Sequence, residues 1–446
     1  MEAAQLVRAH RRVDPAWALI WGAGGVALAG LFLALGLVLG TAPLPLPVVL
    51  GFGAGLLGTL ALALARYDAA VALGVLLLAA VRLEPAPSDL VFGVVIAVAF
   101  VTGRLYLERV PLSVTVLVSG FLALNLLAAT DAVDGARAVE FFGITLYLGV
   151  FGLWLTAYVT SARRARLVLL AYLTGAALSA AVACLALIAP FPGAEAFVDG
   201  PRAQGLFKDP NVFGPFLVPA ILILMDETVA PRLLQFRLVT KLALLSVMTI
   251  GVVFSFSRAA WLNLAVGTLV LLAVLALRRG GGRRAMTLLI VTLIAGAALF
   301  GAVAATSSME FLTERAALQD YDAQRFGAQA SGLEVAAEHP LGIGPGQFEA
   351  ISDLSAHSTY VRALAEEGVL GVLLLLGLML LTLGFAARNV ALGVDTYGIG
   401  SAGLLAAWCG LLANSSFVDT LHWRHLWLVA ALIWAGTAVR AGYPGR

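Results

Sequence analysis

The sequence predicts an all-α polytopic membrane protein with 12 to 14 transmembrane helices. Of its 446 residues 61% are hydrophobic and only 12% are charged, about half the charged fraction of an ordinary soluble domain. Apolar runs of roughly 17–25 residues, the length that crosses a bilayer as a helix, recur from Trp17 to the C-terminal end.

Taken in order, the apolar runs define the candidate spans. The N-terminal run follows a start too polar for a signal peptide and is itself long, so it is expected to be a retained span. Several of the later runs are short, which leaves 12 to 14 complete crossings. The candidate spans are 17–40, 45–65, 68–82, 88–103, 112–129, 139–160, 166–189, 211–226, 237–254, 259–278, 285–306, 360–386, 397–413 and 424–439.

The charged residues between these spans predict the orientation. With fourteen crossings, the loops RAHRR, SARRAR, PRLLQFRLVTK and RRGGGRR share one side. That side carries 19 Lys and Arg, and the opposite side carries 9. Because cations collect on the cytoplasmic side, both termini are expected to be cytoplasmic.

The predicted organisation has three parts: N-terminal transmembrane helices (1–306), one large loop on the outer side (307–359) and C-terminal transmembrane helices (360–446). Apolar residues recur in the loop at helical spacing, which predicts an amphipathic helix along the membrane surface. They are Phe326, Ala330, Leu333 and Ala337.

Several classes of function are disfavoured. Cys184 and Cys409 both lie in apolar segments, so neither a disulfide framework nor a zinc site is expected. The chain has no P-loop, no GxGxxG and no basic stripe for nucleic acid. No internal repeat is evident, and the spans hold few polar residues, which weakens a transporter interpretation without excluding it.

Three cations of the outer face stand in unusual settings. Arg258 lies at a membrane boundary, and Arg202 and Lys208 lie in a Gly/Pro-rich loop before a span. A guanidinium near hydrocarbon is costly without a partner, and its planar fork suits the oxygens of a diphosphate. The alternative is that each arginine extends to the lipid headgroups, and Arg362 can pair with Glu366 one turn on.

His357 precedes a predicted span, so its ring lies at a helix N-terminus, where the helix dipole disfavours imidazolium whereas a bound diphosphate would favour it. The alternative is a structural hydrogen bond. His422 and His425 lie at a Trp-rich helix entrance and are interpreted as interfacial anchors. Asp320 and Asp322 form a D-x-D, a weak metal motif, and no metal is expected.

Three segments resemble the O-antigen ligase and polymerase superfamily: PRAQGLFKDPNVFGPFL (201–217), FSFSRAAWL (254–262) and a long stretch that begins at Arg325. That stretch contains HPLGIGPGQF and AHSTYVRALAEEGVLG. They are similar to the family's R-x-x-G-x-F-x-[ND]-P-N, S-R-[GA]-[AG]-[WL] and A-H-[NS]-x-Y elements. Ser358 stands where the family usually has Asn.

The resemblance implies a GT-C-like glycosyltransferase of the bacterial inner membrane, with the loop 307–359 in the periplasm. Such a protein moves a glycan from undecaprenyl diphosphate to an acceptor on the periplasmic face, without a cofactor. His357 matches the essential histidine. Arg202 and Arg258 match the arginines assigned to the donor diphosphate, and Arg325 matches a loop arginine. Lys208 and Asn211 are expected to be secondary contacts. The expected partners are the lipid-linked donor, a lipid A-core acceptor and membrane lipids, but no nucleic acid.

Within the superfamily three activities remain open: ligation of O-antigen to lipid A-core, polymerisation of one lipid-linked glycan onto another, and glycosylation of protein hydroxyls. The single outer loop of about 50 residues favours the ligase. A non-catalytic transporter of lipid-linked saccharide is the alternative from another class.

Overall fold

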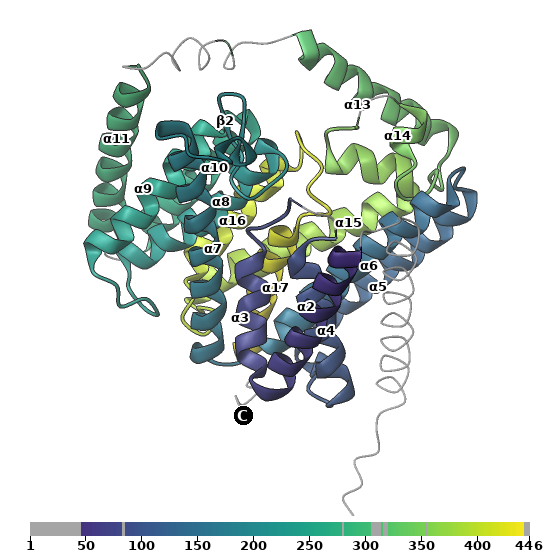
Figure 1. Cartoon of the computed structure of the whole chain (residues 1–446), viewed down its shortest axis with the longest axis horizontal. Coiled ribbons are helices and arrows are strands. Elements are labelled where there is room, and N and C mark those ends of the chain that lie inside the picture. The colour runs from purple at the N-terminus through teal and green to yellow at the C-terminus, as the bar shows by residue number, and fades with distance from the viewer. Residues whose placement is uncertain are drawn as a thin grey trace, which may run out of the picture. The chain divides into compact units, whose positions relative to one another are not determined.

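The computed structural model describes residues 46–82, 85–278, 281–304, 314, 320–352 and 355–440. These residues are mostly helical (Figure 1). The predicted first span, 17–40, lies outside them. Each of the other thirteen candidate spans coincides with a helix, so the prediction of an all-α polytopic membrane protein is confirmed.

Among the described residues, six helices are long and apolar enough to cross a membrane. Shorter elements lie between them. The α-helices that coincide with candidate spans are α2 (Leu46–Ala65), α3 (Tyr67–Leu77), α4 (Pro87–Val101), α5 (Leu112–Ala128), α6 (Gly135–Tyr158), α7 (Ala162–Ile188), α8 (Pro210–Val229), α9 (Leu238–Phe254), α10 (Arg258–Leu277), α11 (Gly282–Ala304), α15 (Thr359–Leu392), α16 (Ser401–Asn414) and α17 (Arg424–Arg440).

The remaining elements belong to connecting segments. Two short antiparallel strands pair Val198 with Ala203. They are β1 (Val198–Asp199) and β2 (Arg202–Ala203), accompanied by the 3₁₀ turns η2 (Leu107–Arg109), η3 (Ala129–Asp131) and η4 (Ala194–Phe197), and by the helices α13 (Asp320–Glu338) and α14 (Phe348–Ile351).

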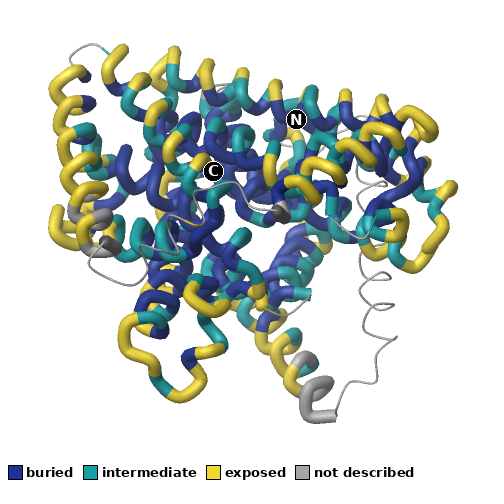
Figure 2. Tube along the Cα trace, turned by 90° about the horizontal axis from the view of Figure 1, so that it is seen from above, coloured by how far each residue is buried: buried dark blue, intermediate teal, exposed yellow. Residues whose placement is uncertain are grey.

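Helix α8 is the most enclosed of the six long helices, with 83% of its most apolar stretch buried. It packs against α7, α9, α10 and α16. Small residues allow this close approach, as in other membrane helix bundles. A Cβ on Gly214 would lie 2.5 Å from the Ser255 hydroxyl, and one on Gly267 would lie 2.3 Å from Leu222. In Figure 2 the buried residues follow the inner faces of the packed helices and the exposed residues follow the outer turns.

Several helices begin at capping residues that belong to the sequence motifs. The Asp209 carboxylate accepts the Asn211 N–H at the start of α8, with Pro210 at the first helical position. The Ser257 hydroxyl caps α10 directly before Arg258. Ser358 caps α15 and accepts the Val361 N–H. Ser is among the residues favoured at this helix-capping position.

Helix α15 is broken at Gly368, whose φ of 72° and ψ of −174° are accessible to glycine. The turn before α14 docks into this break. The N–H groups of Ile343 and Gly344 donate to the carbonyls of Ala365 and Glu366, and Val369 N–H donates to Pro340 O. A Cβ on Gly368 would lie 2.4 Å from the Pro340 carbonyl oxygen. The glycines of the motif thus join the segment before His357 to the helix that follows it.

A helix is present where the outer loop was expected to form one. The four residues of the predicted apolar stripe, Phe326, Ala330, Leu333 and Ala337, are all exposed on α13. Its opposite face packs on α15, where Val335 contacts the cluster of Phe348, Ala356 and Ala365. The apolar stripe therefore lies on the face of α13 opposite to α15, and its contact with a membrane surface stays a prediction.

Candidate active site

Loops that the charge pattern assigns to one side of the membrane meet around a cavity of about 680 Å³. Asn211, Arg258 and His357 line it, each at or beside the N-terminus of a different helix. The complete lining is Val81, Phe207, Lys208, Asp209, Asn211, Val212, Phe256, Arg258, Ala259, Leu262, Asp322, Arg325, Phe326, Gln329, Ser355, His357, Arg362, Phe417, Val418, Asp419, His422, Trp423 and Arg424.

His357 is held in an unusual backbone conformation, with a φ of +46°. Non-glycine residues adopt this region rarely, though histidine is among the more tolerant. The side chain of Gln329 donates to the His357 carbonyl at 3.3 Å, and Ser358 begins the helix immediately after it. The Gln329 hydrogen bond and the start of α15 hold the backbone of His357 in place and therefore fix the direction of its side chain.

The charge state of His357 follows from its surroundings. Burial lowers the pKa of the imidazole below its ordinary value, and the positive charge of Arg325 lowers it further. Asp209, Glu349 and Asp419 act in the opposite direction without reversing the shift. The ring is therefore neutral at pH 7 and can accept a proton.

Arg258 faces the cavity together with an acidic partner from α13. Its guanidinium makes two hydrogen bonds to the Asp322 carboxylate, one of them 2.9 Å from Nη1 to Oδ2. The Arg258 side chain keeps 30% of its surface exposed. The guanidinium is therefore partly exposed. It binds the Asp322 carboxylate through two parallel hydrogen bonds, the geometry in which arginine also binds other oxyanions.

The other predicted residues divide into two groups. Lys208, Asn211 and Arg325 line the cavity. Arg202 does not, and its side chain is 12% exposed. Its guanidinium donates to the Asn211 side-chain oxygen and to the Ser255 carbonyl, both at 2.9 Å. Arg202 thus supports the loops that present Asn211 and Arg258.

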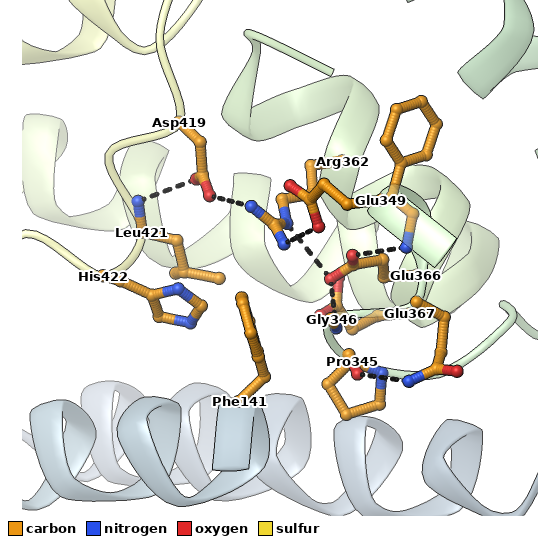
Figure 3. Close-up of polar contacts among 12 residues, drawn as sticks. Phe141, Pro345, Gly346, Glu349, Arg362, Glu366, Glu367, Asp419, Leu421 and His422 are labelled. Carbon is orange, nitrogen blue, oxygen red and sulfur yellow. Dashed lines mark hydrogen bonds and ion pairs between the residues drawn. The ribbon is translucent and has the colours of Figure 1, made fainter. Parts of the chain in front are cut away.

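Beside the cavity, Arg362 is the centre of a closed ionic cluster (Figure 3). It pairs with Glu349 at 2.9 Å, with Asp419 at 2.9 Å and with Glu366 at 3.2 Å. The expected pairing with Glu366 is therefore present. Its guanidinium also lies 5.0 Å from the centre of the Phe141 ring. With 8% of its side chain exposed, Arg362 is mainly structural.

Glu366 connects this cluster to the glycine-rich turn. Its two carboxylate oxygens accept N–H groups from Gly346 and Phe348, at 2.9 and 3.0 Å. Figure 3 shows the carboxylate between Arg362 and the turn. One buried glutamate therefore joins the motif that precedes His357 to the helix that follows it.

Asp419 and His422 were not assigned to the site from the sequence, yet both line the cavity. Burial alone would raise the pKa of Asp419, but Arg362, His422 and the Leu421 N–H together lower it, so it is a carboxylate at pH 7. The Thr145 hydroxyl donates to Phe141 O and also lies 2.9 Å from His422 Nε2.

The interpretation of His425 as an interfacial anchor is wrong. His425 is 2% exposed and packs edge-on against Phe216. The DTLHWRHLW segment instead turns both histidines inward. His425 follows Arg424, which pairs with Asp89 of α4 and draws the start of α17 into the bundle.

In the part of the chain that the structure describes, no group of three or more His, Cys, Asp or Glu side chains is arranged for a metal ion. Asp322, one half of the D-x-D, pairs with Arg258. The side chain of Asp320 lies outside the described side chains.

The comparison with protein families supports the resemblance. Residues 243–376, under a third of the chain, match the family model described as O-antigen ligase. No curated protein matches the chain. The matched segment contains Arg258, Arg325 and His357, whereas Arg202 precedes it. The match supports the resemblance that the motifs indicate: the chain is a multi-pass membrane protein, and its residues 243–376 are similar to the O-antigen ligase family.

Proposed function

We propose that this protein is a glycosyltransferase that moves O-antigen glycan from undecaprenyl diphosphate to lipid A-core on the periplasmic face of the inner membrane. The observation that carries the proposal is the cavity itself. It brings His357, whose pKa is lowered, together with Lys208, Arg258 and Arg325 where the N-termini of three helices meet.

This arrangement suits a diphosphate leaving group. The N-termini of α8, α10 and α15 direct the positive ends of their dipoles toward the cavity, which favours an anion there. Arg258 supplies a fork-shaped donor, and Lys208 and Arg325 supply further positive charge. Arg202 lies outside the cavity and stabilises its wall through hydrogen bonds to the Asn211 side chain and the Ser255 carbonyl. Such preorganised charges stabilise the leaving diphosphate as its negative charge develops.

His357 is the proposed general base. Its neutral ring takes the proton from an acceptor hydroxyl as that oxygen attacks the anomeric carbon. The bond from the anomeric carbon to the diphosphate breaks on the opposite face, and undecaprenyl diphosphate leaves with the bonding electrons. The single displacement inverts the anomeric configuration. Because the diphosphate is itself a good leaving group, the mechanism needs no paired carboxylates of the kind that hydrolases use.

The identity of the acceptor separates the proposed ligase from a polymerase. Both reactions use the same undecaprenyl-diphosphate-linked donor, so the test must vary the acceptor alone. The purified chain is reconstituted with a defined undecaprenyl-diphosphate glycan and offered either lipid A-core or a second lipid-linked glycan.

We expect a glycosylated lipid A-core product with inverted anomeric configuration. Elongation of the second lipid-linked glycan, with lipid A-core untouched, would replace the ligase with a polymerase. Movement of intact lipid-linked glycan across the vesicle membrane, without any new glycosidic bond, would support the transporter instead.

A further inference from the structure

A second hollow lies between α3 and α7. It has a volume of about 600 Å³. Its walls are mostly apolar, and two arginines stand at one end. The lining consists of Ala72, Leu73, Leu76, Arg163, Arg166, Leu167, Leu170, Ala171 and Thr174.

The packing of the two helices produces the groove. α3 and α7 touch tightly near Gly175, where a Cβ would lie only 2.5 Å from the Leu76 carbonyl oxygen. At the other end of the contact Arg163 reaches Asp68 at 3.2 Å. Between these two points the walls are leucine and alanine side chains, several of them half-buried. α7 is long and apolar enough to cross a membrane, and α3 is a shorter apolar helix beside it, so the channel between them suits lipid chains and not water.

The two arginines give the groove a positive end. Arg163 and Arg166 are three residues apart, so they project from one face of α7. Both are exposed, Arg163 with 81% of its side chain accessible. The charge of Asp68 is shared with Arg164 at 3.5 Å and with the Tyr158 hydroxyl at 2.9 Å. Three arginines against one carboxylate leave this end with a positive excess.

The groove is separate from the cavity around His357. α7 is 27 residues long, which corresponds to about 40 Å of helix. Arg163 lies in its first turn, whereas the segment that follows its last turn leads to Phe207 and Lys208 of the cavity. The groove therefore opens at the opposite end of the bundle, on the side that the positive-inside count assigns to the cytoplasm.

We propose that this groove binds an anionic phospholipid, with an acyl chain along the leucines of α3 and α7 and the phosphate on Arg163 and Arg166. An apolar channel with a basic end matches the two parts of such a lipid. Basic sites between membrane helices on the cytoplasmic side bind anionic headgroups by this charge complementarity. The inference does not depend on the glycosyl-transfer chemistry.

Native mass spectrometry of the full-length chain in detergent tests the headgroup. The probes are phosphatidylglycerol and phosphatidylcholine with identical acyl chains. We expect preferential retention of phosphatidylglycerol. The double variant Arg163→Gln/Arg166→Gln should bind it roughly 30-fold more weakly, given about 1 kcal/mol per basic residue near an anionic surface.

The matched control is Arg283→Gln/Arg284→Gln. It removes two exposed arginines from the start of α11, on the same predicted side but outside the groove. It should retain phosphatidylglycerol as the wild type does. Equal losses in both double variants, or no loss in the groove variant, would overturn the proposal. Thr174→Trp, at an exposed position of the groove, should weaken binding of both lipids by filling the channel.

A photo-crosslinker at position 174 identifies the occupant in native membranes. We expect a phospholipid adduct on the chain. A cross-link to residues 17–40, or to a second copy of the chain, would mean that protein fills the groove and would overturn the lipid assignment.

Discussion

Arg258 and Arg362 lie beside the same cavity, but their surroundings differ. Arg362 is paired with three carboxylates and has 8% of its side chain exposed. Arg258 pairs with Asp322 and keeps 30% exposed. The first arginine belongs to a closed cluster that fixes the loop before His357. The second keeps an accessible surface on which an incoming anion can compete with a carboxylate.

The difference shows why a count of outward arginines does not identify a binding site. A buried guanidinium that satisfies several carboxylates is costly to disturb, because removing it leaves uncompensated negative charge. A partly exposed one contributes less to folding and is available for ligand. Variants of the two residues should therefore fail in different ways.

The largest effect on folding is expected from Arg362→Met. The substitution leaves Glu349, Glu366 and Asp419 without their shared cation, which should cost about 3–5 kcal/mol of stability. Thermal unfolding of the purified protein measures it. Arg137→Met is the control, since Arg137 is 34% exposed and pairs with Glu349 at 3.1 Å, a pairing worth about 1 kcal/mol or less. A wild-type melting temperature for Arg362→Met would contradict the closed cluster.

Arg258→Ala should behave in the opposite way. We expect a smaller loss of melting temperature than in Arg362→Met, because one buried carboxylate, Asp322, loses its partner instead of three. Glycan transfer should fall roughly 100- to 1,000-fold, the scale for losing one preorganised electrostatic contact. The measurement is single-turnover transfer from the undecaprenyl-diphosphate donor. A near-normal rate would make Arg258 a structural or headgroup-binding residue.

The pH dependence of transfer tests the pair of Arg325 and His357. Because burial and Arg325 lower the pKa of His357, kcat/KM should hold at neutral pH and fall only as the pH drops below the ordinary range of histidine. Arg325→Gln removes a positive charge, so the pKa should rise and the acidic limb should move to higher pH. Glu334→Gln, exposed on the same helix, is the control. If the acidic limb of the pH profile does not move in Arg325→Gln, Arg325 does not influence the pKa of His357.

The smallest effect is expected from Asp322→Asn. In the wild type the diphosphate must displace the Asp322 carboxylate from Arg258, and the neutral amide competes more weakly. The KM for the donor should fall by up to about fivefold, the scale of a partly exposed ion pair, with kcat little changed. An increase in KM would mean that Asp322 holds Arg258 in its binding geometry.

Much of the fold follows from local sequence. Apolar length located the helices, and charge counting grouped the loops that meet around the cavity, as the contact between Val81 and Phe207 illustrates. The capping residues are also local: Asp209, Ser257 and Ser358 are typical helix starts. The motif containing His357 lies in the segment that matches the O-antigen ligase family.

The partners of the arginines required the folded structure. Glu366 is one turn from Arg362 and was predictable, but Asp419 is 57 residues away and Asp322 is 64 residues from Arg258. Nothing in a helical period indicates such pairs. The docking of the glycine-rich turn into the break at Gly368 is equally non-local. Arg202 could not be placed from sequence either. Its sequence context predicts a cavity residue, whereas its guanidinium binds Asn211 and the Ser255 carbonyl and does not line the cavity.

The most direct test of the account is glycan transfer by His357→Ala. Removing a general base should lower the rate roughly 100- to 10,000-fold, with the melting temperature preserved. His339→Ala, at an exposed position of the same loop, should transfer at the wild-type rate. If His357→Ala transfers glycan as fast as His339→Ala, His357 is not the base and the cavity is not the catalytic centre.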